Sequence, residues 1–212
     1  MNLPEFRELI EQGSSGELML PEYFALRETT GDPFNLGGIG NIARHFSYWS
    51  RVAHLIGNAD NVLDIGCGCG LAARLYRLRT EGRVVALDRE PALGIAQALY
   101  HTPDVEYVEA DLMDCDLPEG PFDVVAMTEV YEHLPEDVGL RVVGQIAERL
   151  AEGGRLVMSV PFEAEEYGNQ YHARHFRGAE DVLCEVSERL SVGTMLYLLL
   201  DRAAILSREA RT

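Results

Sequence analysis

Basic residues and cysteines are both scarce in this chain. Its 212 residues include 18 lysines and arginines against 35 aspartates and glutamates, which gives a formal net charge of −17 at pH 7. Broad nucleic-acid binding needs a basic surface, so this balance disfavours it. The four cysteines do not have the spacing of a disulfide framework, and we expect them to be reduced thiols.

Long apolar runs are also absent from the sequence. The longest, Met195 to Leu200, has the length of a core strand and not that of a membrane span. Residues 1–5 show neither the basic nor the apolar segment of a secretory signal. We therefore expect a cytoplasmic protein with no membrane partner. The chain length and the 47% of hydrophobic residues suit one domain with a full core.

The most informative stretch of the chain runs from residue 62 to residue 75. The apolar run Val62 to Ile65 predicts a buried strand, and the helical pattern begins at Leu71. Between them, three glycines stand at alternate positions: Gly66, Gly68 and Gly70. A strand, a glycine turn and a helix bring backbone N–H groups close to a nucleotide-like ligand. The spacing is G-x-G-x-G, which differs from the G-x-G-x-x-G of dinucleotide-binding proteins.

Asp64, two residues before the first glycine, indicates what kind of ligand this turn binds. A carboxylate at this position would repel a pyrophosphate and attract a cation. S-adenosylmethionine fits, because it has a nucleoside at one end and a charged amino acid at the other. The stretch resembles motif I of the class I S-adenosylmethionine-dependent methyltransferases. That resemblance implies an α/β fold, a doubly wound Rossmann-like sheet of seven strands, mostly parallel, with a final antiparallel hairpin strand.

The later segments fit the same frame, and the resemblance covers about residues 40–209. We expect a methyltransferase domain over residues 37–212, while residues 1–36 are either a lid over the site or a surface appendage. Residues 195–206 fit a helix as well as the hairpin, and the resemblance favours the hairpin. Strands are predicted over residues 83–88, 105–109, 121–128, 155–160, 191–200 and 203–208. Helices are predicted over residues 37–57, 71–79, 91–100, 136–151 and 179–189, with Gly153 and Gly154 ending the fourth of them.

Several acidic residues are candidates for holding the cofactor. Asp88 ends the second strand, 24 residues after Asp64, which is about the spacing of an acid that receives ribose hydroxyls. The alternative for Asp88 is a cap of the next helix. By resemblance, Asp111 accepts the adenine amino group and the backbone of Leu112 contacts a ring nitrogen, although Asp111 also suits a simple turn. The other predicted cofactor-binding residues are Arg44, which could instead be solvated, Arg89, Thr128 and Glu129.

The segment after the fourth strand carries an E-x-x-E-H element, formed by Glu129, Glu132 and His133. In the ubiquinone-pathway O-methyltransferases and the small-RNA 3′-terminal 2′-O-methyltransferases, this resemblance implies divalent metal binding, completed in the second group by a later histidine. Here His172 or His175 could take that place, and such ligands suit Mg²⁺ or Mn²⁺. In the metal-free alternative, which we favour, His133, His172 or His175 is a general base.

The tract from His172 to Phe176 resembles an H-x-R-x-F element that lines the acceptor pocket of many small-molecule methyltransferases. A purely structural role at the entry to a helix is the alternative. The sequence as a whole predicts methyl transfer to the oxygen or nitrogen of a small-molecule acceptor. A metal-dependent RNA 2′-O-methyltransferase is a second hypothesis, which the net charge disfavours. A non-catalytic cofactor-binding protein is a third.

Overall fold

The computed structural model describes residues 48–68, 70–90, 92–100, 104–162, 172–187, 190, 195–196 and 203–207. Residues 1–36, predicted as a lid or a surface appendage, and the predicted cofactor ligand Arg44 lie outside these residues. Of the helix predicted over residues 37–57, the described part is helical from residue 48 to residue 55.

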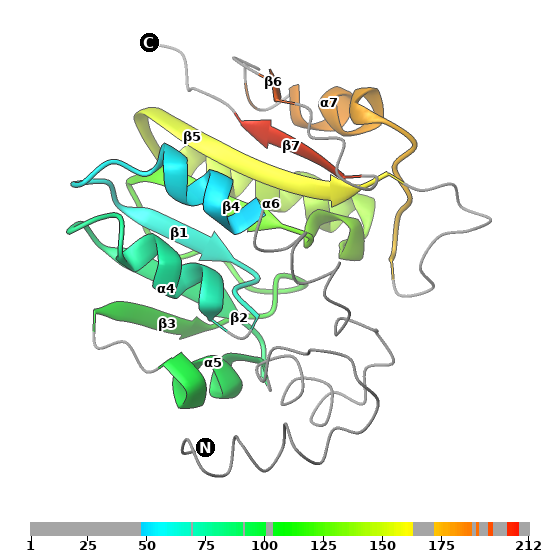
Figure 1. The fold of residues 1–212 in the computed structure, drawn as a ribbon. Helices are drawn as coiled ribbons and strands as arrows, with labels where there is room; N and C mark the ends of the chain where they lie inside the picture. The colour runs from blue at the N-terminus through cyan, green and yellow to red at the C-terminus, as the bar shows by residue number, and fades with distance from the viewer. Residues whose placement is uncertain are drawn as a thin grey trace, which may run out of the picture.

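Five parallel strands form the centre of the molecule (Figure 1). They are β1 (Val62–Ile65), β2 (Val84–Asp88), β3 (Val105–Glu109), β4 (Phe122–Thr128) and β5 (Leu150–Pro161). Their order across the sheet is β3-β2-β1-β4-β5, and every adjacent pair is parallel. The order reverses direction between β1 and β4, which is the topological switch point where ligands bind in open α/β sheets. The predicted Rossmann-like α/β fold is confirmed.

Helices cover both faces of this sheet. One face carries α4 (Leu71–Arg77), α5 (Ala92–Tyr100) and the helical residues 48–55, and the other carries α6 (Glu136–Arg149) and α7 (Ala179–Ser187). Alternation along the strands assigns the side chains: Val62 packs toward α4, whereas Leu63 and Ile65 pack toward α6. Strands buried on both faces explain why β1, β2 and β4 are almost continuously apolar.

The junction of α6 and β5 differs from the prediction. Gly153 and Gly154 were expected to end the helix, but α6 ends at Arg149 and Leu150 already pairs with Phe122 of β4. The two glycines lie inside β5, where the register to β4 shifts. A Cβ on Gly154 would come within 2.9 Å of the Phe122 carbonyl oxygen, so close strand contact requires glycine here.

Two short strands follow at the edge of the sheet. β7 (Ala203–Ser207) pairs antiparallel with β5, and β6 (Met195–Leu196) pairs antiparallel with β7. Residues 197–202, which connect β6 and β7, lie outside the described residues.

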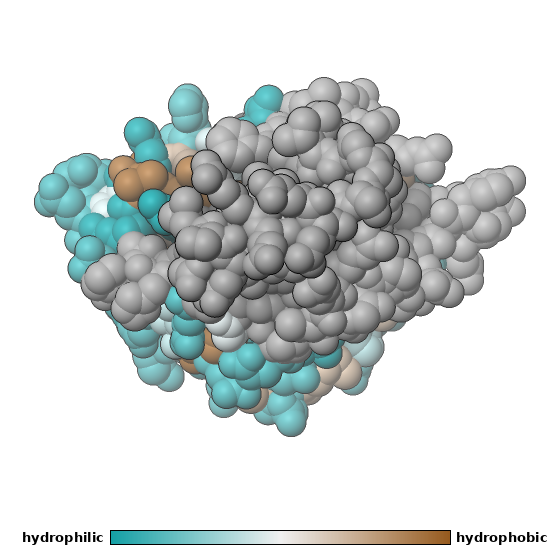
Figure 2. All heavy atoms as spheres, turned by 60° about the horizontal axis from the view of Figure 1, so that its bottom comes forward, coloured by the Kyte–Doolittle hydropathy of each residue, from teal (hydrophilic) through white to brown (hydrophobic). Residues whose placement is uncertain are grey.

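The described surface is mostly hydrophilic in the view of Figure 2, with apolar atoms in small separate groups. Among the described residues, the large hydrophobic side chains that are exposed are Leu78 and Met113. No helix in the described part of the chain combines the length and the apolar character needed to cross a bilayer.

Candidate functional site

The glycine turn joins the carboxyl end of β1 to the start of α4. Gly66, Gly68 and Gly70 have φ values of +71°, +52° and +83°, a backbone region that L side chains rarely adopt. The Gly66 N–H donates to the Leu87 carbonyl oxygen of β2 at 2.9 Å, and a Cβ on Gly66 would collide with the Val130 side chain. A Cβ on Gly68 would meet no described atom within 4 Å, so the turn presents its backbone to open space at this residue.

Asp88, the last residue of β2, is bonded to this turn. Its Oδ2 accepts the Gly68 N–H at 2.8 Å, and its Oδ1 accepts the Arg89 N–H at 2.8 Å. Burial raises the pKa of the Asp88 carboxyl, and these two hydrogen bonds act in the opposite direction. Neither donor belongs to α5, so these contacts do not make Asp88 a cap of the next helix. Each carboxylate oxygen keeps a second lone pair for a ligand hydroxyl.

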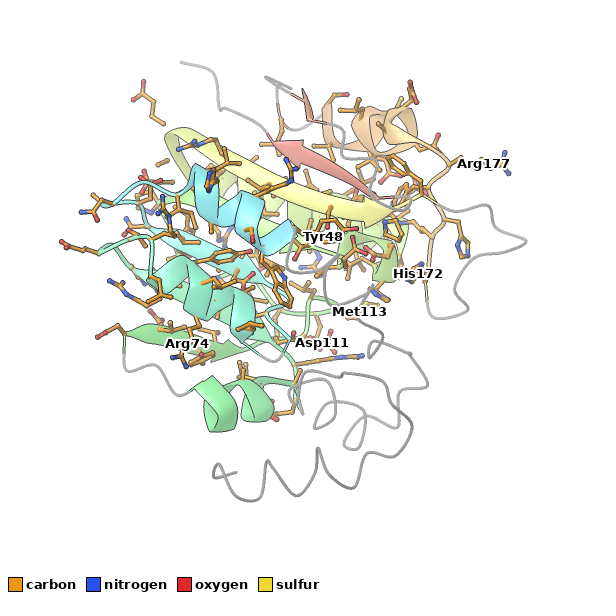
Figure 3. The ribbon with its side chains drawn as sticks, viewed as in Figure 1. Tyr48, Arg74, Asp111, Met113, His172 and Arg177 are labelled. Atoms are coloured by element: carbon orange, nitrogen blue, oxygen red, sulfur yellow. The ribbon has the colours of Figure 1, made fainter. Side chains whose placement is uncertain are left out.

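The loop after β3 lies beside the end of β2. The Ala110 N–H donates to the Asp88 carbonyl oxygen at 3.0 Å, and the Asp111 Oδ1 accepts the Met113 N–H at 2.9 Å. Asp111 therefore closes a turn with one oxygen, as the structural alternative predicted. Figure 3 shows Asp111 and Met113 beyond the carboxyl ends of the strands.

Three polar side chains of α6 hold this loop, and the sequence reading did not single them out. Arg141 donates to the carbonyl oxygens of Leu112, Met113 and Cys115. Gln145 bonds to Asp116 and to the Leu117 N–H, and Arg149 donates to the Leu117 carbonyl oxygen. Their spacing in the sequence could have identified them, because residues 141, 145 and 149 follow one another at four-residue steps and so lie on one face of a helix.

Asp64 lies on β1 beneath the glycine turn and is 1% exposed. Within the described part of the chain, its Oδ2 has no hydrogen-bond partner. Burial, and secondarily the neighbouring Asp88 carboxylate, raise the pKa of Asp64 to about 8. Tyr76 of α4 is fully buried nearby, and its pKa is raised by burial and by Asp64. A cation placed beside Asp64 would favour the ionised carboxylate and satisfy its free oxygen.

The end of β4 carries Thr128 and Glu129. Thr128 pairs with Ser159 of β5 in the sheet register. Glu129 has a φ of +56°, the only positive value at a described residue other than glycine. Its N–H donates to the Ser159 carbonyl oxygen at 3.0 Å, and the Ser159 hydroxyl donates to its Oε1 at 2.9 Å. These bonds fix Glu129 against β5, and such backbone strain is typical of functional sites.

Three of the predicted catalytic or metal-binding residues come together across two loops. Glu132 and His133 belong to the 3-10 helix η1 (Tyr131–His133), and His172 belongs to the loop after β5. One ligand atom from each of these residues lies within 4.8 Å of the others. The ring centroids of His133 and His172 are 4.8 Å apart, and those of His172 and His175 are 6.2 Å apart. Glu129 is not part of this group.

The electrostatics of this group combine a buried acid with accessible imidazoles. Glu132 is 1% exposed, whereas the side chain of His133 is 41% exposed. The His133 Nε2 lies 3.8 Å from the Glu132 Oε1. A carboxylate and two imidazoles can hold a divalent metal ion with positions left for other ligands, or they can orient a histidine as a base.

Comparison with known proteins agrees with this geometry. Residues 62–154 match the family model described as a methyltransferase domain. Sterol 24-C-methyltransferase from Eremothecium gossypii is 32% identical over 158 residues, which are 72% of this chain and 40% of that protein. Trans-aconitate 2-methyltransferase from Klebsiella pneumoniae is 32% identical over 53% of this chain and 42% of that protein. The chain thus spans about two fifths of the length of these relatives.

The fold is shared with solved structures. The crystal structure of the N-methyltransferase NodS from Bradyrhizobium japonicum WM9, in complex with S-adenosyl-L-homocysteine, superposes with a TM-score of 0.70. It is 21% identical, and the superposition covers 90% of this chain and 99% of that one.

Proposed function

We propose that this chain, which carries a class I S-adenosylmethionine-dependent methyltransferase domain, transfers a methyl group to a small-molecule acceptor. The observation that carries the proposal is the bond between Asp88 and Gly68 at the carboxyl edge of the sheet. It joins a glycine turn, which presents its backbone to open space at Gly68, to an acid suited to a ribose diol, at the switch point of a doubly wound sheet.

The cofactor would lie along this edge. Asp88 would accept the ribose hydroxyls, with Gly66, Gly68 and Gly70 providing close backbone approach. Asp111 and Leu112 would contact the adenine, with Arg89 near its edge. Asp64 would contact the charged amine of the cofactor, because its buried Oδ2 has no hydrogen-bond partner among the described residues and a cation there would favour the ionised carboxylate. Thr128 and Glu129 would line the space between the cofactor and the acceptor.

When bound, S-adenosylmethionine supplies an electrophilic methyl group. The residues of this chain would align the acceptor and accept the proton that it loses. His133, His172 and His175 are the candidates for the base, and the closeness of the first two rings supports a shared role. The names of the relatives include a sterol C-methyltransferase and a trans-aconitate methyltransferase, which support a small acceptor without specifying it. O- or N-methylation remains the expectation.

A metal-assisted form of this reaction has one observation in its favour, the cluster of Glu132, His133 and His172. The donor set fits a divalent ion, and its two imidazoles suit Mn²⁺ better than Mg²⁺. Such an ion would supply Lewis acidity toward an acceptor hydroxyl. The same cluster is the support for an RNA 2′-O-methyltransferase, against which the net charge of −17 stands.

The proposal also includes the division of the chain into domains. We assign residues 37–212 to the methyltransferase domain and residues 1–36 to a lid or appendage. The sheet would be completed to seven strands by the antiparallel hairpin of β6 and β7, which the pairings of both strands support.

The test begins with calorimetric titration of S-adenosylhomocysteine into the full chain. Binding with one site per chain is expected, and absence of heat together with absence of a thermal shift would refute the cofactor assignment. Transfer of a labelled methyl group is then measured with a panel of small hydroxyl, amine and carboxylate acceptors, and with a short RNA. Binding without transfer to any of them would favour a non-catalytic cofactor-binding protein.

A further inference from the structure

We propose that Arg174 is a positioning residue that holds the loop after β5 against η1, so that His172 meets His133. This inference rests on the proposed function only in assigning the histidines to the acceptor side of the site. The docking of the two loops is argued from the contacts of Arg174 and of the side chains that surround it.

Three hydrogen bonds from Arg174 cross from its own loop to the segment after β4. Its backbone N–H donates to the Glu132 carbonyl oxygen at 3.1 Å. Its Nε donates to the Leu134 carbonyl oxygen at 2.8 Å, and its Nη2 donates to that of Tyr131 at 3.3 Å. One residue therefore donates to three carbonyl groups of the η1 segment, including that of Tyr131, which also accepts the Leu134 N–H.

The guanidinium also packs against two aromatic rings. Its central carbon lies 4.4 Å from the ring centroid of Tyr131 and 5.0 Å from that of Phe176. The two rings are themselves stacked at 5.8 Å. Tyr131 comes from η1 and Phe176 from the loop after β5, so these contacts join the same two segments as the hydrogen bonds.

Residues of α6 and α7 also contact Arg174 and Tyr131. Glu185 of α7 accepts hydrogen bonds from the Arg174 Nη1 and from the Tyr131 hydroxyl, the latter at 2.7 Å. Gly139 of α6 lies so close that a Cβ there would be 2.7 Å from the Arg174 Nη2 and 2.9 Å from the Tyr131 ring. A planar, forked cation fits this space, and a lysine would reproduce the charge without the fork.

The consequence concerns the two histidines. His133 stands two residues after Tyr131, and His172 stands two residues before Arg174. Their rings are 4.8 Å apart although 39 positions separate them in the sequence (172 − 133). Short chain segments thus connect each imidazole to the Arg174–Tyr131 contact, and release of that contact would let the imidazoles separate. Figure 3 places His172 on the side of the loop that faces the sheet edge, while Arg177 projects outward.

The test measures the ring contact itself by NMR in the full chain. The wild type should show nuclear Overhauser effects between the ring protons of His133 and His172. Arg174→Gln should abolish them, while amide resonances of β1, β2 and β4 stay in place. Arg177→Gln is the matched control, because this arginine is exposed on the same loop, and it should leave the effects unchanged.

Two further variants keep the test decisive. If Arg174→Gln does not fold, Arg174→Lys and Tyr131→Phe are used, and each should weaken the ring contact several-fold. Unchanged effects in the folded variants, or their absence from the wild type, would overturn the inference. The affinity for S-adenosylhomocysteine should stay within twofold in Arg174→Gln. The calorimetric titration of S-adenosylhomocysteine into the wild type tests the proposed function separately.

Discussion

The Asp88 carboxylate accepts a hydrogen bond from the backbone N–H of Gly68, with 2.8 Å between Oδ2 and nitrogen. This bond joins the end of β2 to the turn after β1. The two parts of the chain proposed to hold the adenosyl group are therefore one structural unit. A substitution at Asp88 acts on both, because it removes an acceptor from the turn and from the ribose site together.

Replacement of Asp88 by alanine should weaken S-adenosylhomocysteine binding at least tenfold. The loss of buried, charge-assisted hydrogen bonds costs about 1.5–3 kcal/mol each. Calorimetry measures the change, with Asp104→Asn, an exposed acid at the opposite end of the strands, as the control. Unchanged affinity in the folded Asp88→Ala variant would refute the ribose role.

The stability of the cofactor-free protein should fall as the pH rises from about 4 to about 8. The pKa of Asp64 is raised in the folded state from 3.8 to about 8, so the folded state holds more protons than the unfolded state across this window. Deprotonation then favours unfolding, with a slope of up to about 1.4 kcal/mol per pH unit. Denaturant titrations between pH 5 and pH 9 measure this slope.

Asp64→Asn is the variant that isolates this contribution, because the amide does not titrate. Its free energy of unfolding should depend less on pH than that of the wild type. Above about pH 8 the two proteins should show the same slope, because Asp64 is then ionised in both the folded and the unfolded wild type. Parallel curves for the two proteins would show that Asp64 is ionised in the folded state.

Arg141→Gln should lower cofactor affinity several-fold. The side chain donates to three carbonyl oxygens of the loop that carries the proposed adenine contacts. Each such hydrogen bond stabilises the folded conformation of the loop by about 1 kcal/mol. Arg77→Gln is the control, because Arg77 bonds to the Gly82 carbonyl oxygen on the other side of the sheet. Equal affinity losses in both variants would point to general destabilisation instead.

A chelator distinguishes metal-assisted methyl transfer from metal-free transfer with a histidine as base. If a metal assists, excess EDTA should abolish turnover of the acceptor identified by the panel, and Mn²⁺ should restore it. His172→Gln should then weaken the response to Mn²⁺ at least tenfold, because one of three ligands is lost. His54→Gln, at an exposed site on another helix, should behave as the wild type. Full activity in EDTA would instead assign the histidines to proton transfer.

Local sequence patterns were sufficient to predict the first strand, the glycine turn and the helix that follows. The apolar run of β1, the glycines and the helical spacing of α4 could be identified from the sequence, because strand, turn and helix each depend on neighbouring residues. The acid at the end of β2 could be placed beside the turn, because parallel strands end at one edge of a sheet. The end of α6 was misplaced, because the pairing of Leu150 with Phe122 is a contact between distant segments.

The sequence by itself determined the α/β class, the glycine turn and the positions of the candidate ligands along the chain. Only the tertiary structure decided that Asp64 is buried, with no hydrogen-bond partner for its Oδ2 among the described residues. It also decided that Arg141 holds the loop after β3 and that Arg174 joins two loops. Arg174 and the Leu134 carbonyl oxygen that it binds are 40 residues apart. Hydrogen bonds and burial of this kind depend on how distant elements pack, and no local pattern records that packing.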